Sequence, residues 1–67
     1  MSRFIEIMPR YYNETIFINI DNITKIIREY RYGEESFIIY LGDGTYIEIY
    51  AEEFHDKVEK YIKGEKL

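Results

Sequence analysis

The residues whose type and spacing could support metal chemistry surround the single histidine of the chain, His55. Glu52 precedes it by three positions and Glu59 follows it by four, so all three side chains would lie on one face of a helix. A Glu/His/Glu triple can bind a divalent cation, but the same spacing also describes an ordinary solvated helix face. Because the chain has no second histidine and no cysteine, a tight zinc site is not expected. We predict neither a metal nor a cofactor.

Nucleophilic catalysis requires a hydroxyl or thiol beside an activating base, and the sequence offers no such pair. The hydroxyls of Ser36 and Thr45 fall in predicted turns, far from His55 along the chain. The stretch Gly42-Asp43-Gly44 is no phosphate loop, because it joins two predicted strands and carries an aspartate where phosphate would lie. We therefore predict that the protein is not an enzyme.

Aromatic residues are the remaining feature that could carry function, since the chain of 67 residues contains eight tyrosines. The predicted interaction surface consists of Ile38, Tyr30, Tyr32, Tyr40, Tyr46 and Tyr50. These tyrosines could be half-buried sheet residues, or line a second small core under the first strand, because the ring buries while the hydroxyl reaches water. They could also form a self-association surface, because tyrosine is enriched at protein interfaces.

A third interpretation is a ligand platform for single-stranded nucleic acid or a nucleotide, in which tyrosine rings stack on bases between arginines. The residues of this alternative are Arg28, Arg31, Tyr30, Tyr32, Tyr40 and Tyr46. Glutamates of the same region would repel phosphate; they are Glu29, Glu34, Glu35 and Glu48. We therefore expect binding to a second copy or to another protein to be favoured over nucleic-acid binding.

The composition is that of one small domain, which spans residues 1–67 and lies near the lower size limit for an unassisted core. Without cysteine, its stability must come from a dense core or from oligomerisation. The net charge of −4 argues against a protein that grips phosphate backbones, which usually shows a basic face. No long apolar run follows Met1, so we expect neither a signal peptide nor a membrane span, and a cytoplasmic location.

The elements that would position these residues are mainly strands. Residues 3–8 and 15–20 alternate between apolar and polar side chains and are expected to form the first two strands, with Pro9 ending the first. Asp21 and Asn22 would form a tight turn. Residues 23–32 fit a helix by the spacing of their isoleucines and a strand by their Ile and Tyr content. We favour a strand here, with room for a bulge, followed by a polar turn over residues 33–36.

The best-defined local structure is the predicted hairpin of strands 37–41 and 45–50. A three-residue loop, with Gly44 in the left-handed region at a bulge, places Ile39 opposite Ile47. That register gathers every strongly apolar side chain except Ile38 on one face, whereas a two-residue loop would mix the faces. The other face then carries Tyr40 and its neighbours.

After residue 50 the apolar period changes to steps of three and four, which predicts a helix. The apolar stripe comprises Ala51, Phe54, Val58, Tyr61 and Ile62. The predicted fold class is α+β: a small antiparallel β-meander of about five strands with one C-terminal α-helix packed on one face.

The runs "FINIDNITKI" and "SFIIYLGDGTYIEIYAEEFHDKVEKYI" resemble the small flagellar proteins called FlbD. The matched positions are Asn19, Ile23, Ile26, Gly44, Ile47, Ile49, Val58 and Ile62. All are structural, so the resemblance implies a β-meander with a C-terminal helix and suggests no catalytic residues. From this resemblance and the tyrosines together, we expect a small accessory protein of bacterial or phage type that binds other proteins. We expect it to form a homo-oligomer and to act through a tyrosine-bearing sheet face or a strand edge.

Overall fold

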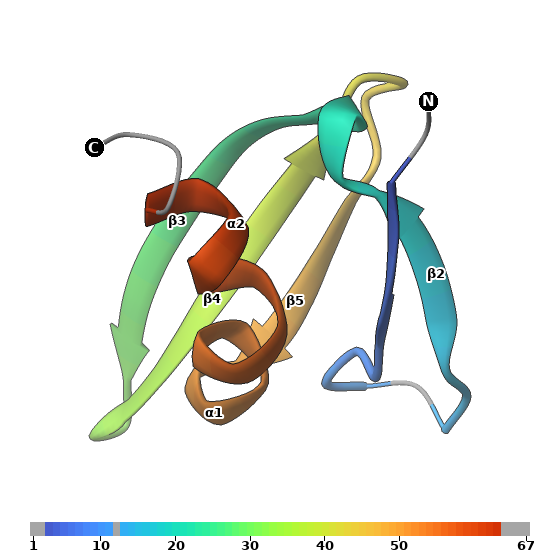
Figure 1. Ribbon diagram of the computed structural model, residues 1–67. Helices are drawn as coiled ribbons and strands as arrows, with labels where there is room; N and C mark the ends of the chain where they lie inside the picture. Colours follow the sequence, from blue (N-terminus) through green and yellow to red (C-terminus); the bar gives the residue numbers. More distant parts are fainter. Residues whose placement is uncertain (1–2, 12, 64–67) are drawn as a thin grey trace.

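The computed structural model describes residues 3–11 and 13–63 and shows five antiparallel strands in two small sheets, followed by a helix (Figure 1). The first sheet pairs β1 (Phe4–Ile7) with β2 (Ile16–Asn19). The second contains β3 (Ile23–Arg31), β4 (Glu34–Leu41) and β5 (Tyr46–Tyr50) in that order. The predicted α+β class is confirmed. The meander is interrupted, however, because β2 and β3 belong to different sheets and are joined by a 3-10 helix, η1 (Ile20–Asn22).

The segment that fitted both a helix and a strand is the strand β3, and it carries a bulge. Ile23 lies opposite Leu41 and Lys25 lies opposite Tyr40, so Thr24 is the extra residue of the bulge. The Thr24 hydroxyl donates to the carbonyl of Tyr40 at 3.3 Å, which gives the extra residue a bond to the neighbouring strand. The strand prediction is therefore confirmed.

The turn between β3 and β4 is shorter than predicted. Arg31 already pairs with Glu34, so only Tyr32 and Gly33 form the loop, and β4 begins three residues earlier than expected. Both loop residues have positive φ, 54° for Tyr32 and 76° for Gly33, as a type I′ turn requires. Tyrosine is a costly residue in this conformation, which is why the turn was not recognised.

The hairpin of β4 and β5 has the predicted register. Ile39 lies opposite Ile47, Leu41 N–H donates to the carbonyl of Thr45 at 2.9 Å, and Gly44 has a φ of 93°. The three-residue loop with a left-handed glycine is confirmed.

The helical segment that follows consists of α1 (Ala51–Glu53), a π-helical turn η2 (Phe54–Val58) and α2 (Glu59–Lys63). It packs on the apolar face of the three-stranded sheet, where Phe54 stacks on Phe37 with ring centroids 3.9 Å apart. Val58 is fully buried, so the middle of the predicted stripe forms the contact.

The β1–β2 hairpin lies beside the helix and completes the same core (Figure 1). The buried core residues are Ile5, Ile7, Ile18, Phe37, Ile39, Ile49, Phe54 and Val58. The amide of Met8 donates to Glu53 at 3.1 Å, which ties the end of β1 to the helix. Within the described residues the first strand therefore adds to one common core on the helix side and does not cover the tyrosines of the opposite face.

Candidate functional site

The three-stranded sheet has a face turned away from the helix, which we call the outer face. Its residues form cross-strand rows, which are Lys25–Tyr40–Tyr46, then Ile27–Ile38–Glu48, then Glu29–Ser36–Tyr50, and finally Arg31–Glu34 beside the turn. None of the helices or strands in the described ranges packs over these rows. The loop that follows β1 reaches the Ser36–Tyr50 end through Arg10, and Ser36 is buried there, so only the opposite end of the outer face is open.

One end of the outer face is aromatic and apolar, and we call it the aromatic patch: Ile27, Ile38, Tyr40 and Tyr46. The rings of Tyr40 and Tyr46 are neighbours, with centroids 5.4 Å apart. Tyr46 remains 61% exposed and Ile27 38% exposed. The ammonium of Lys25 lies 4.7 Å from the centroid of the Tyr40 ring and borders the patch. A hollow of about 220 Å³ adjoins Tyr46, between β5 and the loop that follows β1.

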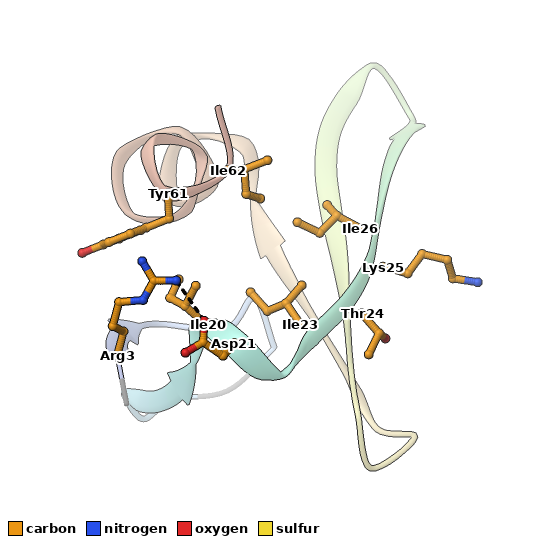
Figure 2. A pocket seen from close by; sticks show the side chains of 9 residues that line it. All are labelled: Arg3, Ile20, Asp21, Ile23, Thr24, Lys25, Ile26, Tyr61 and Ile62. Carbon is orange, nitrogen blue, oxygen red and sulfur yellow. Dashed lines mark hydrogen bonds and ion pairs between the residues drawn. The ribbon is translucent and has the colours of Figure 1, made fainter. Parts of the chain in front are cut away.

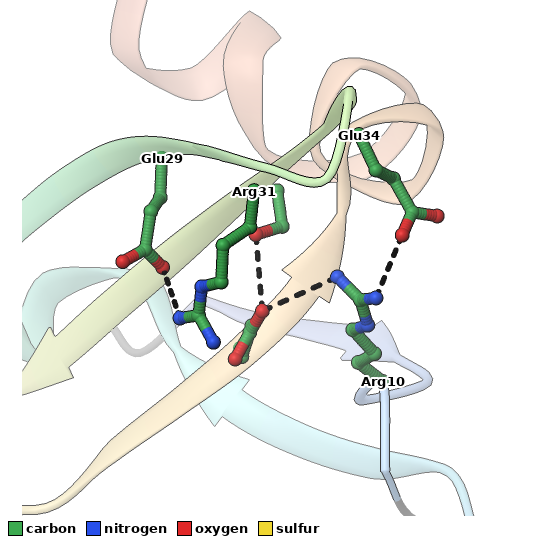
Figure 3. Close-up of polar contacts among 6 residues, drawn as sticks. Arg10, Glu29, Arg31 and Glu34 are labelled. Carbon is green, nitrogen blue, oxygen red and sulfur yellow. Dashed lines mark hydrogen bonds and ion pairs between the residues drawn. The ribbon is translucent and has the colours of Figure 1, made fainter.

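The other end of the outer face is a network of charged side chains (Figure 3). Arg10, from the loop after β1, contacts Glu34 at 2.7 Å and Glu48 at 3.3 Å. The Ser36 hydroxyl donates to Glu48 at 3.0 Å, and Ser36 itself is buried. The guanidinium of Arg10 also lies 4.9 Å from the centroid of the Tyr50 ring. The loop is thereby anchored to β4 and β5, and the carboxylates at this end have cationic partners.

Arg31 belongs to the same charged end. It contacts Glu29, two residues earlier on β3, at 2.7 Å (Figure 3). The hydrogen bond and the charge of Glu29 raise the pKa of Arg31 above its ordinary value. Because Arg31 is engaged by a carboxylate on its own strand, any phosphate would have to displace that partner.

The structure brings together four of the six residues predicted for the interaction surface. Ile38, Tyr40, Tyr46 and Tyr50 share the outer face. Tyr30 does not join them, because it lies opposite Glu35. Glu35 has the strand parity of Phe37, so Tyr30 lies on the helix side of the sheet. Tyr32 occupies the tip of the turn and is 99% exposed.

The six residues of the nucleic-acid alternative are divided between surfaces. Tyr40, Tyr46 and Arg31 lie on the outer face, whereas Arg28 and Tyr30 lie on the helix side. Arg28 contacts Glu35 at 3.6 Å. No single surface therefore collects these tyrosines and arginines as a stacking platform would.

The histidine of the helix has local partners. His55 Nδ1 lies 2.7 Å from Glu59 Oε1, and its ring packs edge-on against Phe37 and Phe54. Among residues 3–11 and 13–63, no group of three or more His, Cys, Asp or Glu side chains is arranged to hold a metal ion.

Ile27 and Lys25 on the outer face, and Arg10 in the loop beside it, were not predicted from the sequence. Ile27 was missed because the parity of β3 was open; once Ile26 is assigned to the core, Ile27 must face outward. Arg10 was missed because its contacts depend on the path of a loop, and no local sequence signal reports that path.

A second pair of exposed aromatic residues lies on the first sheet. Phe4 and Phe17 are 59% and 64% exposed on β1 and β2. They lie on a different sheet from Tyr40 and Tyr46, so substitutions of these two phenylalanines can serve as a control for substitutions of the two tyrosines.

In the described part of the chain, no helix combines the length and apolarity needed to cross a bilayer. Comparison with protein-family models, curated proteins and solved structures gave no match, so the residues and geometry described above carry the functional argument.

Proposed function

We propose that the protein is a small non-enzymatic interaction protein that binds a second copy of itself, or another protein, through the outer face. The observation that carries the proposal is the aromatic patch, where four adjoining apolar or aromatic side chains lie on a sheet face that no described helix or strand covers. Single exposed apolar residues are ordinary on protein surfaces. A contiguous group bordered by polar residues is typical of an interaction site.

The surroundings of the patch suit a protein partner. Tyrosine combines a large apolar ring with a hydroxyl that can stay wet, which is why it is enriched at interfaces. The hollow beside Tyr46 gives the surface relief that a partner side chain could fill. The charged network around Arg10 and Glu48 borders the patch and provides the polar rim that such interfaces have.

The alternative function is binding of single-stranded nucleic acid. It is supported by the adjacent rings of Tyr40 and Tyr46 with Lys25 beside them. It would weaken steeply with salt, because it requires phosphate contacts. We place it second, because the carboxylates of Glu29 and Glu48 share the same face.

The resemblance to FlbD suggests a cellular context in which the partners could be sought. A bacterial or phage cytoplasm, with flagellar assembly as one context, is where we would first look for partners. This setting is part of the proposal, and the fold itself is compatible with many others.

Light scattering across a concentration series tests the proposal. We expect the wild-type chain to show a mass above its monomer mass of 8.2 kDa. Replacing Tyr40 and Tyr46 together with serine should lower that mass while the circular dichroism spectrum stays that of a folded protein.

The matched control replaces Phe4 and Phe17 with serine, which removes two exposed rings from the other sheet. If the control lowers the mass and the tyrosine variant does not, the outer face is the wrong surface. A wild-type monomer whose mass shifts only when a short single-stranded oligonucleotide is added would replace the proposal with its alternative.

A further inference from the structure

The strand β3 lies at one edge of the second sheet. Its nine residues make it the longest strand, and among the described residues no strand pairs with its other side. Such an edge presents unpaired backbone N–H and C=O groups and is a template for another strand. A second strand could therefore extend the sheet here.

The geometry of the turn indicates which residues offer these backbone groups. In a type I′ turn the residues that flank the loop, Arg31 and Glu34, form a hydrogen-bonded pair. Hydrogen-bonded and non-hydrogen-bonded pairs alternate along an antiparallel ladder. The N–H and C=O groups of Ile26, Arg28 and Tyr30 therefore point away from β4, toward the free edge.

We propose that two copies of the chain pair through β3 in antiparallel fashion, with Ile27 of each copy on the two-fold axis. Because outward-pointing residues must bond to outward-pointing residues, Ile26 of one copy bonds to Arg28 of the other. Lys25 then lies opposite Glu29, twice in the symmetric pair. These two residues and Ile27 all have side chains on the outer face, at non-hydrogen-bonded positions, where facing side chains are closest.

Charge distinguishes this register from its neighbours. A pair centred on Arg28 would place Arg28 opposite its own copy and Lys25 opposite Arg31, so that like charges meet. A pair centred on Glu29 would set the two Glu29 carboxylates against each other. A pair centred on Ile26 would leave Lys25 opposite Ile27 with no charge partner. Opposite charges that face each other across strands are favourable and like charges are not. A pair centred on Tyr30 would also set Glu29 opposite Arg31, but it would overlap over residues 29–31 of β3 alone, whereas the register centred on Ile27 pairs the whole strand and is preferred.

The helix side of the sheet provides an independent observation. A groove of about 470 Å³ runs beside β3 at the C-terminal end of the helix (Figure 2). Its apolar lining consists of Ile20, Ile23, Ile26, Tyr61 and Ile62. Figure 2 shows Ile23 and Ile26 pointing toward the helix residues, whereas Lys25 points to the other side of the strand.

Tyr30 supplies a side chain for this groove. It is 67% exposed and lies on the helix side of the sheet. In the register centred on Ile27, Tyr30 of one copy lies beside the bulge at Thr24 of the other, and Thr24 lines the groove. The tyrosine ring of each copy thus has a site beside the helix of its mate, where isoleucines lie next to the polar side chains of Arg3 and Asp21.

The pairing uses the backbone edge of β3 and shares Ile27 with the aromatic patch, but it does not use the rings of Tyr40 and Tyr46. It would join the two sheets into one of six strands and bring both aromatic patches onto the same face. The edge and the outer face can therefore be tested separately.

Cysteine cross-linking is the direct test, because the native chain has no cysteine. In an Ile27→Cys variant the two facing Cα atoms would be about 4.5 Å apart, within the range that a disulfide spans. Under mild oxidation we expect a covalent dimer. The matched control is Arg31→Cys, whose two copies would be eight residues apart along the paired strands, or about 26 Å, and should not cross-link.

The cross-linking is done in the background that carries Tyr40→Ser and Tyr46→Ser, so that association through the two tyrosines of the outer face cannot produce it. A disulfide at position 27 in this background supports the edge pairing even if the outer-face proposal fails. Absence of cross-linking at position 27, or equal cross-linking at position 31, overturns the edge pairing and leaves the outer-face proposal standing.

Charge reversal tests the register. Lys25→Glu alone and Glu29→Lys alone each place like charges opposite each other twice, and we expect the dissociation constant to rise about 30-fold. When the two variants are mixed, the two substituted side chains face each other and the native Lys25 faces the native Glu29. Opposite charges then meet at both places, so a heterodimer should form although neither variant dimerises well alone. The double reversal should restore the homodimer. If the mixture stays monomeric while the wild type dimerises, the register is refuted.

Discussion

Replacing Tyr32 with asparagine should stabilise the protein, although no contact would be gained. Tyr32 is the first loop residue of the β3–β4 turn and holds a φ of 54°. Its side chain is 99% exposed, so the tyrosine ring contributes no packing that the substitution would lose. Asparagine tolerates the left-handed region because its short polar side chain bonds locally. Asn-Gly is also the preferred sequence for this turn.

The expected gain follows from the backbone alone. An ordinary residue in the left-handed conformation costs roughly 1–2 kcal/mol, and asparagine recovers part of this. We expect the free energy of unfolding to rise by about 1 kcal/mol, which for a domain of this size corresponds to a melting temperature higher by ~4–8 °C.

The matched control is Gly33→Ala at the neighbouring position. A Cβ at Gly33 would meet no atom within 4 Å, so its effect is purely that of a φ of 76°. We expect the control to lose about 1 kcal/mol. Both variants are measured by thermal and urea denaturation at one protein concentration, because association also affects the melting temperature. A Tyr32→Asn variant no more stable than the wild type would refute the assignment of strain to this turn.

Two further predictions concern the core and the β4–β5 loop. Replacing Phe54 with alanine removes the ring stacked on the sheet and should lower the free energy of unfolding by about 3–5 kcal/mol; Phe54→Leu, which keeps most of the volume, should retain a cooperative urea transition. Hydrogen bonds from the hydroxyl and the backbone amide of Thr45 lower the pKa of Asp43 below its ordinary value. Because the folded pKa is the lower one, the stabilisation is present above the unfolded pKa and is lost as the pH falls through the folded pKa. A carboxyl ¹³C NMR titration should show this low pKa, and Thr45→Val should raise it; an unchanged pKa in that variant would contradict the assigned cause.

The sequence was sufficient to predict the hairpin of β4 and β5, because only one register buries its apolar residues. Ile39 and Ile47 must face the same side, and Gly44 permits the left-handed loop that brings them together. Pattern and turn chemistry agreed there, so the predicted register held, although β4 begins at Glu34 and β5 at Tyr46.

The outer face was only partly predictable, because the parity of β3 was ambiguous. Ile26 and Ile27 are adjacent and equally apolar, so either could have faced the core. The structure gives the core side to Ile26, which sends Tyr30 to the helix side and Ile27 outward. Packing against the rest of the fold determines which isoleucine faces the core, and the sequence of a single strand does not contain that information.

The turn after β3 and the π-helical turn were missed for different reasons. Tyr32 contradicts the residue preference of its own turn, so a rule based on preference must fail there. The helical stripe runs through Phe54 and Val58 in steps of three and four, a pattern that remains the same whether the turn between them is α or π.

The docking of β1 against the helix has a consequence for the order of folding. The Lys57 ammonium donates to the carbonyl of Glu6 at 3.5 Å across 51 positions of the chain, and the bond between Met8 and Glu53 spans 45. The β3–β4 and β4–β5 hairpins need only short loops and can close within microseconds. Contacts between residues that are distant in the sequence form only after the chain has lost much more loop-closure entropy. The second sheet should therefore form early and β1 should join late, so that substitutions in β1 mainly accelerate unfolding while those in the hairpins slow folding.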